Sequence, residues 1–111
     1  NKYLIYLKTE KMAKTKVAQK SELKEGQGKL VNVNGKEIAL FTVNGQFFAI
    51  DNTCLHRGGP LAEGFLEEDK VTCPWHGWQF DVKTGQNLMP GMGKLNSYKV
   101  TVENEDIFIE D

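Results

Sequence analysis

The 111-residue chain has few of the residues that build metal or disulfide sites, with only two cysteines and two histidines. It also lacks any apolar run near the roughly 20 residues that a membrane helix needs. Residues 1–20 show neither the apolar core nor the small-residue cleavage site of a signal peptide. Repeats and low-complexity tracts are absent. We therefore expect a single domain, soluble and cytoplasmic, because two cysteines fit a reducing compartment.

All four of these residues stand in two short motifs. Cys54-Leu55-His56 and Cys73-Pro74-Trp75-His76 are separated by 16 residues. Two soft thiolates and two imidazoles so arranged predict a metal site. A disulfide between the cysteines would leave both histidines unexplained.

The surrounding residues extend these motifs. Cys54-Leu55-His56-Arg57-Gly58-Gly59-Pro60-Leu61, followed by Gly64, resembles the first cluster loop of Rieske-type ferredoxins, and Cys73-Pro74-Trp75-His76-Gly77-Trp78-Gln79-Phe80-Asp81 resembles the second. The resemblance implies one 2Fe-2S cluster, with Cys54 and Cys73 on one iron and His56 and His76 on the other. It further implies a single all-β Rieske domain over residues 1–111. That domain would be an antiparallel β-sandwich base with an inserted cluster-binding subdomain, residues 52–93.

A third segment, Met89-Pro90-Gly91-Met92-Gly93, resembles the family's proline-containing loop that covers the cluster. The residues expected around the ligands are Arg57, Gly58, Trp75, Gly77, Trp78, Phe80 and Pro90. Gly58 and Gly77 suit tight turns because glycine accepts positive φ. We expect Trp75 to shield the cluster, Trp78 to shield it or pack on the base, and Met89 and Met92 to pack.

A structural zinc site is the alternative for the same ligand set, as part of a zinc-bound interaction module. Zinc requires little beyond four ligands and apolar support. The glycine-rich and proline-containing flanks therefore favour the cluster.

The family resemblance implies a soluble one-electron carrier rather than an enzyme. Electrons would come from a flavin-dependent NAD(P)H reductase and pass to a terminal oxygenase of an aromatic-ring-hydroxylating dioxygenase. No histidine remains for the mononuclear iron of an oxygenase catalytic subunit. The alternative is the small subunit of an NAD(P)H-dependent nitrite reductase, whose partner would be the large subunit.

This chain differs from the membrane-anchored respiratory Rieske proteins at two pairs of positions. Their additional disulfide joins positions that here are Gly59 and Trp75. The respiratory proteins also have a serine and a tyrosine whose hydroxyls hydrogen-bond to cluster sulfur. The matching positions in this sequence are Trp78 and Phe80. Neither side chain carries a hydroxyl, so we expect a low reduction potential.

The charge of the chain is unevenly distributed. Residues 1–20 carry six lysines and one glutamate, whereas residues 21–111 carry eight basic and fourteen acidic side chains, a net charge of −6. An acidic body argues against nucleic-acid binding and fits a partner with a basic face. The alternative is a merely solvated acidic surface.

Strand signals cover most of the remaining chain. Asn34-Gly35 and Asn44-Gly45 separate three β-prone runs, at 30–33, 38–43 and 47–50, and predict two hairpins. A further hairpin is predicted over 97–110, turning at Asn104-Glu105, and one helical turn over 21–25, capped by Ser21. Phe41, Phe47 and Phe48 are expected to pack in the core. Residues 1–11 are interpreted as an extension before a natural start at Met12, or as an edge strand.

Overall fold

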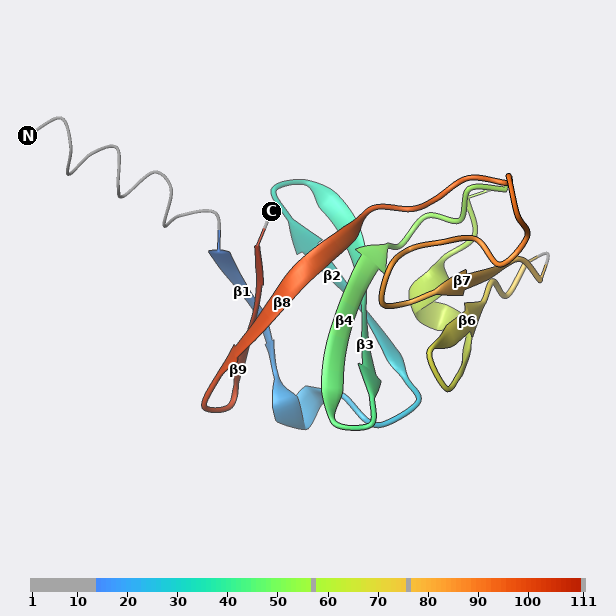
Figure 1. Cartoon of the computed structure of the whole chain (residues 1–111). Coiled ribbons are helices and arrows are strands. Elements are labelled where there is room, and N and C mark those ends of the chain that lie inside the picture. The colour runs from blue at the N-terminus through green and yellow to red at the C-terminus, as the bar shows by residue number, and fades with distance from the viewer. Residues whose placement is uncertain (1–13, 57, 76, 111) are drawn as a thin grey trace, which may run out of the picture.

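The computed structural model describes residues 14–56, 58–75 and 77–110. These residues form nine strands and two 3₁₀ turns (Figure 1). The strands are β1 (Lys14–Gln19), β2 (Gly28–Val33), β3 (Lys36–Val43), β4 (Gln46–Asp51), β5 (Phe65–Glu67), β6 (Lys70–Thr72), β7 (Gln79–Asp81), β8 (Ser97–Glu103) and β9 (Asp106–Glu110). The turns are η1 (Lys20–Glu22) and η2 (Leu61–Glu63). No helix in these ranges is long and apolar enough to cross a membrane.

The strands form two antiparallel sheets. A six-stranded sheet has the order β1-β9-β8-β4-β3-β2, and a three-stranded sheet has the order β5-β6-β7. The larger sheet folds over itself, because β4 and β8 pair only at Ala49–Tyr98 and Ile50–Ser97. Its two halves enclose a common core that includes Val33, Leu40 and Ile109. The predicted all-β fold with a sandwich base is therefore confirmed.

Strand β3 is buried on both of its faces. Ile38 and Leu40 point into the core of the sandwich. Ala39, Phe41 and Val43 point the other way, into a second core shared with the small sheet. Alternate residues of a strand face opposite sides, so β3 forms the wall between the two cores. The insert between β4 and β8 thus rests directly on the base (Figure 1).

The predicted hairpins are present. Asn34 and Gly35 have φ of 52° and 82°, and Asn44 and Gly45 have φ of 51° and 78°. Positive φ at both central residues is the type I′ geometry that joins twisted antiparallel strands. Asn104, in the turn between β8 and β9, also has positive φ. Of the three phenylalanines, Phe41 is fully buried, while Phe47 and Phe48 are half-buried against the cores.

Two elements differ from the sequence predictions. β1 was not predicted, because its sequence Lys-Thr-Lys-Val-Ala-Gln lacks a clear strand pattern; it forms by pairing with β9. The helical turn begins at Lys20 and is a 3₁₀ turn. Gln19 occupies the N-cap position of this turn, and its backbone N–H donates to Glu22 Oε2 at 2.7 Å. Ser21 lies inside the turn and is not its cap.

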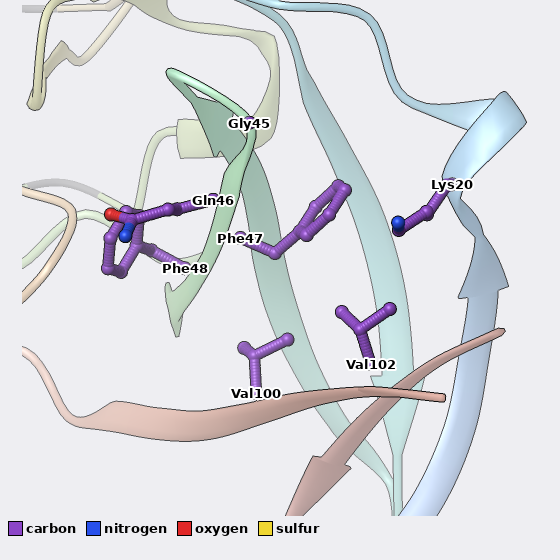
Figure 2. A pocket seen from close by; sticks show the side chains of 7 residues that line it. All are labelled: Lys20, Gly45, Gln46, Phe47, Phe48, Val100 and Val102. Atoms are coloured by element: carbon purple, nitrogen blue, oxygen red, sulfur yellow. The ribbon is translucent and has the colours of Figure 1, made fainter. Parts of the chain in front are cut away.

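The divergence of β4 and β8 opens a recess of about 410 Å³ in the side of the sandwich. Phe47, Val100 and Val102 point toward this space, and Lys20 lies across it (Figure 2). The remaining lining residues are Gly45, Gln46 and Phe48. The predicted ligands are not among these residues.

Candidate metal centre

The first ligand loop is a tight turn that begins at Cys54. An isolated bridge between Thr53 and Pro60 closes it. The Cys54 backbone N–H donates to the Gly59 carbonyl at 2.9 Å, and the Gly58 N–H donates to the Cys54 carbonyl at 2.9 Å. Gly58 has a φ of 77°, as the sequence predicted, where a β-carbon would be strained.

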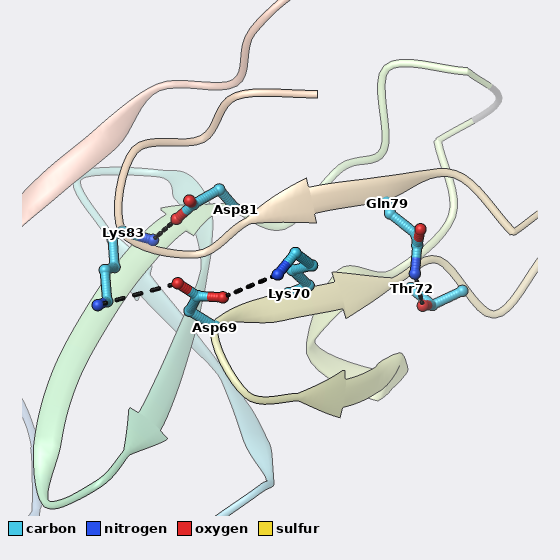
Figure 3. Close-up of polar contacts among 6 residues, drawn as sticks. All are labelled: Asp69, Lys70, Thr72, Gln79, Asp81 and Lys83. Carbon is cyan, nitrogen blue, oxygen red and sulfur yellow. Dashed lines mark hydrogen bonds and ion pairs between the residues drawn. The ribbon is translucent and has the colours of Figure 1, made fainter. Parts of the chain in front are cut away.

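The second ligand loop repeats this pattern. Thr72 and Gln79 pair across its base, and Gln79 Nε2 donates to Thr72 Oγ1 at 3.1 Å (Figure 3). The Cys73 N–H donates to the Trp78 carbonyl at 2.8 Å, and the Gly77 N–H donates to the Cys73 carbonyl at 3.1 Å. Gly77 has a φ of 78°. Each loop is therefore a six-residue segment that begins with a cysteine and is closed by the same pair of backbone hydrogen bonds.

The strands that carry the second loop are also tied at their far end. The Lys83 backbone N–H donates to Asp81 Oδ1 at 2.7 Å. The Asp69 carboxylate lies 3.4 Å from Lys70 Nζ and 3.9 Å from Lys83 Nζ (Figure 3). Such exposed ion pairs contribute at most about 1 kcal/mol each, so the strand pairing itself holds the loop.

Both candidate cysteines are buried, at 3% and 2% exposed, and they do not form a disulfide with one another. Cys54 and Cys73 belong to the same buried cluster as Phe41, Leu61 and Phe80. This places two soft donors in one apolar cluster. Buried thiols in two matched loops are suited to a shared metal cluster.

The two loops approach closely at Gly59. A β-carbon built on Gly59 would lie 2.6 Å from Cys73 Sγ and 3.2 Å from the Trp75 Cγ atom. Gly59 and Trp75 are the positions that the resemblance matched to the respiratory disulfide, and here a glycine faces an indole. The loops can therefore pack together because residue 59 has no side chain.

An aromatic contact links the same two loops. The His56 and Trp78 rings are stacked, with centroids 4.6 Å apart and planes inclined by 15°. Trp78 also packs against the buried cluster that contains the cysteines. Of the two roles predicted for Trp78, packing is present, and the stack on His56 is an additional contact that the sequence did not indicate.

A buried asparagine holds the third loop. Asn87 is 2% exposed, its Oδ1 accepts from the Met89 N–H at 2.9 Å, and its Nδ2 donates to the Met92 carbonyl at 3.3 Å. A β-carbon on Gly93 would lie 3.0 Å from Leu55 Cδ1, so this loop leans on the first one. Sequence reasoning missed Asn87, because its burial depends on contacts formed only in the fold.

The predicted neighbours of the site differ in their exposure to solvent. Met89 and Met92 were expected to pack, but they are 41% and 46% exposed, so that prediction is wrong. They lie on a turn whose backbone, rather than its side chains, is anchored by Asn87. Trp75 is 57% exposed and Pro90 is exposed, whereas Phe80 is fully buried. Arg57 and His76 lie outside the described residues.

The described donors suit a cluster that bridges the two loops. Within residues 14–56, 58–75 and 77–110, no three histidine, cysteine or carboxylate side chains gather as a group around one metal ion. The described candidates are two buried thiols and one imidazole. This mixed thiolate and imidazole set is the donor chemistry of a Rieske centre.

Comparison with known proteins identifies the family. Residues 13–99 match the model of the Rieske [2Fe-2S] domain. The chain belongs to the Rieske [2Fe-2S] domain family. Its cofactor is therefore a Rieske 2Fe-2S cluster, and the prediction of the cluster in place of zinc is confirmed.

Similar Rieske proteins come from oxygenase systems. The chain is 40% identical over 90 residues to the ferredoxin component of the naphthalene 1,2-dioxygenase/salicylate 5-hydroxylase systems of Ralstonia sp, covering 80% of this chain and 86% of that protein. A chain in a complex of reduced oxygenase and oxidised ferredoxin of carbazole 1,9a-dioxygenase is 32% identical with a TM-score of 0.81, covering 88% and 93%.

A second solved structure shares the fold alone. It is described as the small subunit of an NADPH nitrite reductase, and it matches with a TM-score of 0.81 at 22% identity. The match covers 88% of this chain and 98% of that chain.

Proposed function

We propose that this Rieske chain is a one-electron carrier and not itself an enzyme. In the proposal, Cys54, His56, Cys73 and His76 ligate the cluster. A flavin-dependent NAD(P)H reductase supplies the electron, and a terminal oxygenase accepts it. The cluster supplies the reversible one-electron redox change.

One observation carries this proposal: the loops that hold the two buried cysteines also carry exposed apolar side chains. Leu55, between the first cysteine and histidine, is 46% exposed, and Trp75, before the second histidine, is 57% exposed. Met89 and Met92 of the third loop add further exposed apolar surface. We call Leu55, Trp75, Met89 and Met92 the apolar rim. Exposed large apolar groups beside a redox site fit a small, transient docking contact.

The proposed partners come from the relatives. The ferredoxin component from Ralstonia sp belongs to a dioxygenase system, and the carbazole dioxygenase structure contains an oxygenase together with a ferredoxin. The nitrite reductase alternative is supported only by fold similarity. We therefore favour the oxygenase. We also propose that residues 52–93 are the cluster-binding subdomain of one Rieske domain acting in the cytoplasm.

The ligand set is tested by single replacements. Cys54→Ser and Cys73→Ser should each lose the red-brown colour, iron and acid-labile sulfide, because each removes a thiolate from one iron. His56→Cys and His76→Cys should retain a cluster with a lower potential, since a thiolate adds negative charge. Wild-type protein containing zinc and no sulfide would refute the assignment.

The carrier role is tested by reconstitution. The reduced chain is mixed separately with a ring-hydroxylating oxygenase and with a nitrite reductase large subunit, and cluster reoxidation is followed by absorbance. We expect rapid reoxidation by the oxygenase. Reoxidation by the nitrite reductase subunit alone would favour the alternative.

A further inference from the structure

The stack between His56 and Trp78 joins the two ligand loops through their side chains. The ring centroids are 4.6 Å apart and the planes are within 15° of parallel, which is a face-to-face arrangement. His56 comes from the first loop and Trp78 from the last position of the second. From this geometry we infer that Trp78 is a positioning residue, which fixes the His56 imidazole and thereby lowers the reduction potential of the cluster.

Trp78 is itself held in place from two directions. Its carbonyl accepts the hydrogen bond from the Cys73 N–H at 2.8 Å, so its backbone is part of the turn that presents a cysteine. Its ring packs against the buried cluster that includes Phe80 and Val71. A ring fixed in this way offers a rigid face to the imidazole. The inference rests on the proposed role of His56 as a ligand.

The direction of the effect follows from the charge of the site. With two thiolates and two neutral imidazoles, a 2Fe-2S cluster is formally neutral when oxidised and carries one negative charge when reduced. The face of an indole is electron-rich and favours positive charge beside it. The indole also covers one face of the imidazole and excludes water that would stabilise the reduced, anionic state. Both effects favour the oxidised cluster and lower the potential.

Replacements of Trp78 separate stacking from simple filling of space. Trp78→Phe keeps an aromatic face, whereas Trp78→Leu keeps an apolar side chain without one. We expect the potential from voltammetry to rise more in Trp78→Leu than in Trp78→Phe. The electron paramagnetic resonance g values of the reduced cluster should change in the same order, because they report the orientation of the ligand.

A matched control accounts for lost packing. Phe47 is half-buried against the sandwich core, away from both ligand loops. Phe47→Leu should reduce stability while leaving the potential and the g values at their wild-type values. If Trp78→Leu and Trp78→Phe also match the wild type in both measurements, the inference is overturned.

A second test leaves the packing unchanged. The chain has two tryptophans, so in a Trp75→Phe protein Trp78 is the only site for biosynthetic incorporation of fluorotryptophan. Fluorine withdraws electron density from the indole face. We expect the fluorinated protein to have a higher potential than the same variant with ordinary tryptophan. An equal potential would contradict the electronic part of the inference.

These tests distinguish failure of the inference from failure of the ligand assignment. The iron and sulfide content of the wild type and the altered potential of His56→Cys establish the ligand first. With those results in hand, unchanged Trp78 variants count against the role of Trp78 alone.

Discussion

Gly85 lies directly against the backbone of Leu95. The Leu95 N–H donates to the Gly85 carbonyl at 2.9 Å, and a β-carbon on Gly85 would lie 2.1 Å from the Leu95 carbonyl oxygen. Gly85 also has a φ of 81°. This contact ties the chain leaving β7 to the segment that returns to the base.

Gly85→Ala should therefore destabilise the protein strongly. The added methyl group meets backbone rather than a flexible side chain, and the left-handed conformation adds its own strain. We expect a loss of about 3 kcal/mol in the free energy of unfolding. Gly45→Ala is the control, because Gly45 has a φ of 78° with nothing within 4 Å of the added carbon. That variant should lose only about 1 kcal/mol. Denaturant unfolding of the two variants at equal iron content measures both free energies of unfolding. Equal losses of stability in the two variants would contradict the steric explanation.

Charge placed on the apolar rim should impair electron transfer without changing the cluster. Leu55→Glu puts a carboxylate where we propose that the partner docks. We expect about a tenfold higher KM for the ferredoxin in an oxygenase assay, equivalent to about 1.4 kcal/mol of lost binding. Leu30→Glu is the matched control, since Leu30 is 50% exposed on β2. A similar KM for both variants, with unchanged visible spectra, would argue against docking at the rim.

The rate of electron transfer should also fall with salt. The body of the chain has a net charge of −6 over residues 21–111, which would steer it to a basic partner. Screening acts over about 10 Å at 0.1 M ionic strength. Stopped-flow reduction by the cognate reductase across a salt series measures this dependence. A flat profile would mean that the acidic side chains only solvate the surface.

A hydroxyl introduced at Phe80 should raise the reduction potential. Phe80 is fully buried in the cluster of residues that contains both cysteines. If Phe80→Tyr donates a hydrogen bond to cluster sulfur worth about 1.4 kcal/mol, the potential rises by roughly 60 mV. The wild type should lie near the low end of the Rieske range, at roughly −150 mV. Voltammetry measures both, and a wild-type value above zero would contradict the low-potential assignment.

The sequence predicted the parts of this molecule that depend on local chemistry. Asn34-Gly35 and Asn44-Gly45 determine their own turns, and glycines 58 and 77 adopt the positive φ that their place in the ligand loops suggested. Features that depend on distant contacts were not predictable. β1 requires β9 as its partner, and the exposed side chains of Met89 and Met92 follow from the hydrogen bonds of Asn87. The contact between Trp78 and His56 likewise exists only after two separate loops meet.

The position of β3 restricts motion of the part of the molecule in which we propose the cluster ligands. To swing as a rigid arm, this part would have to pull away from Ala39, Phe41 and Val43, which are buried against it. Exposing a Phe or Val side chain costs about 1.5–3 kcal/mol each. A partner that binds the sandwich therefore also fixes the position of the proposed cluster relative to itself. In the proposed carrier role, electron transfer should be set by the orientation of the whole molecule during an encounter, and a cross-link between the small sheet and the base should leave its rate unchanged.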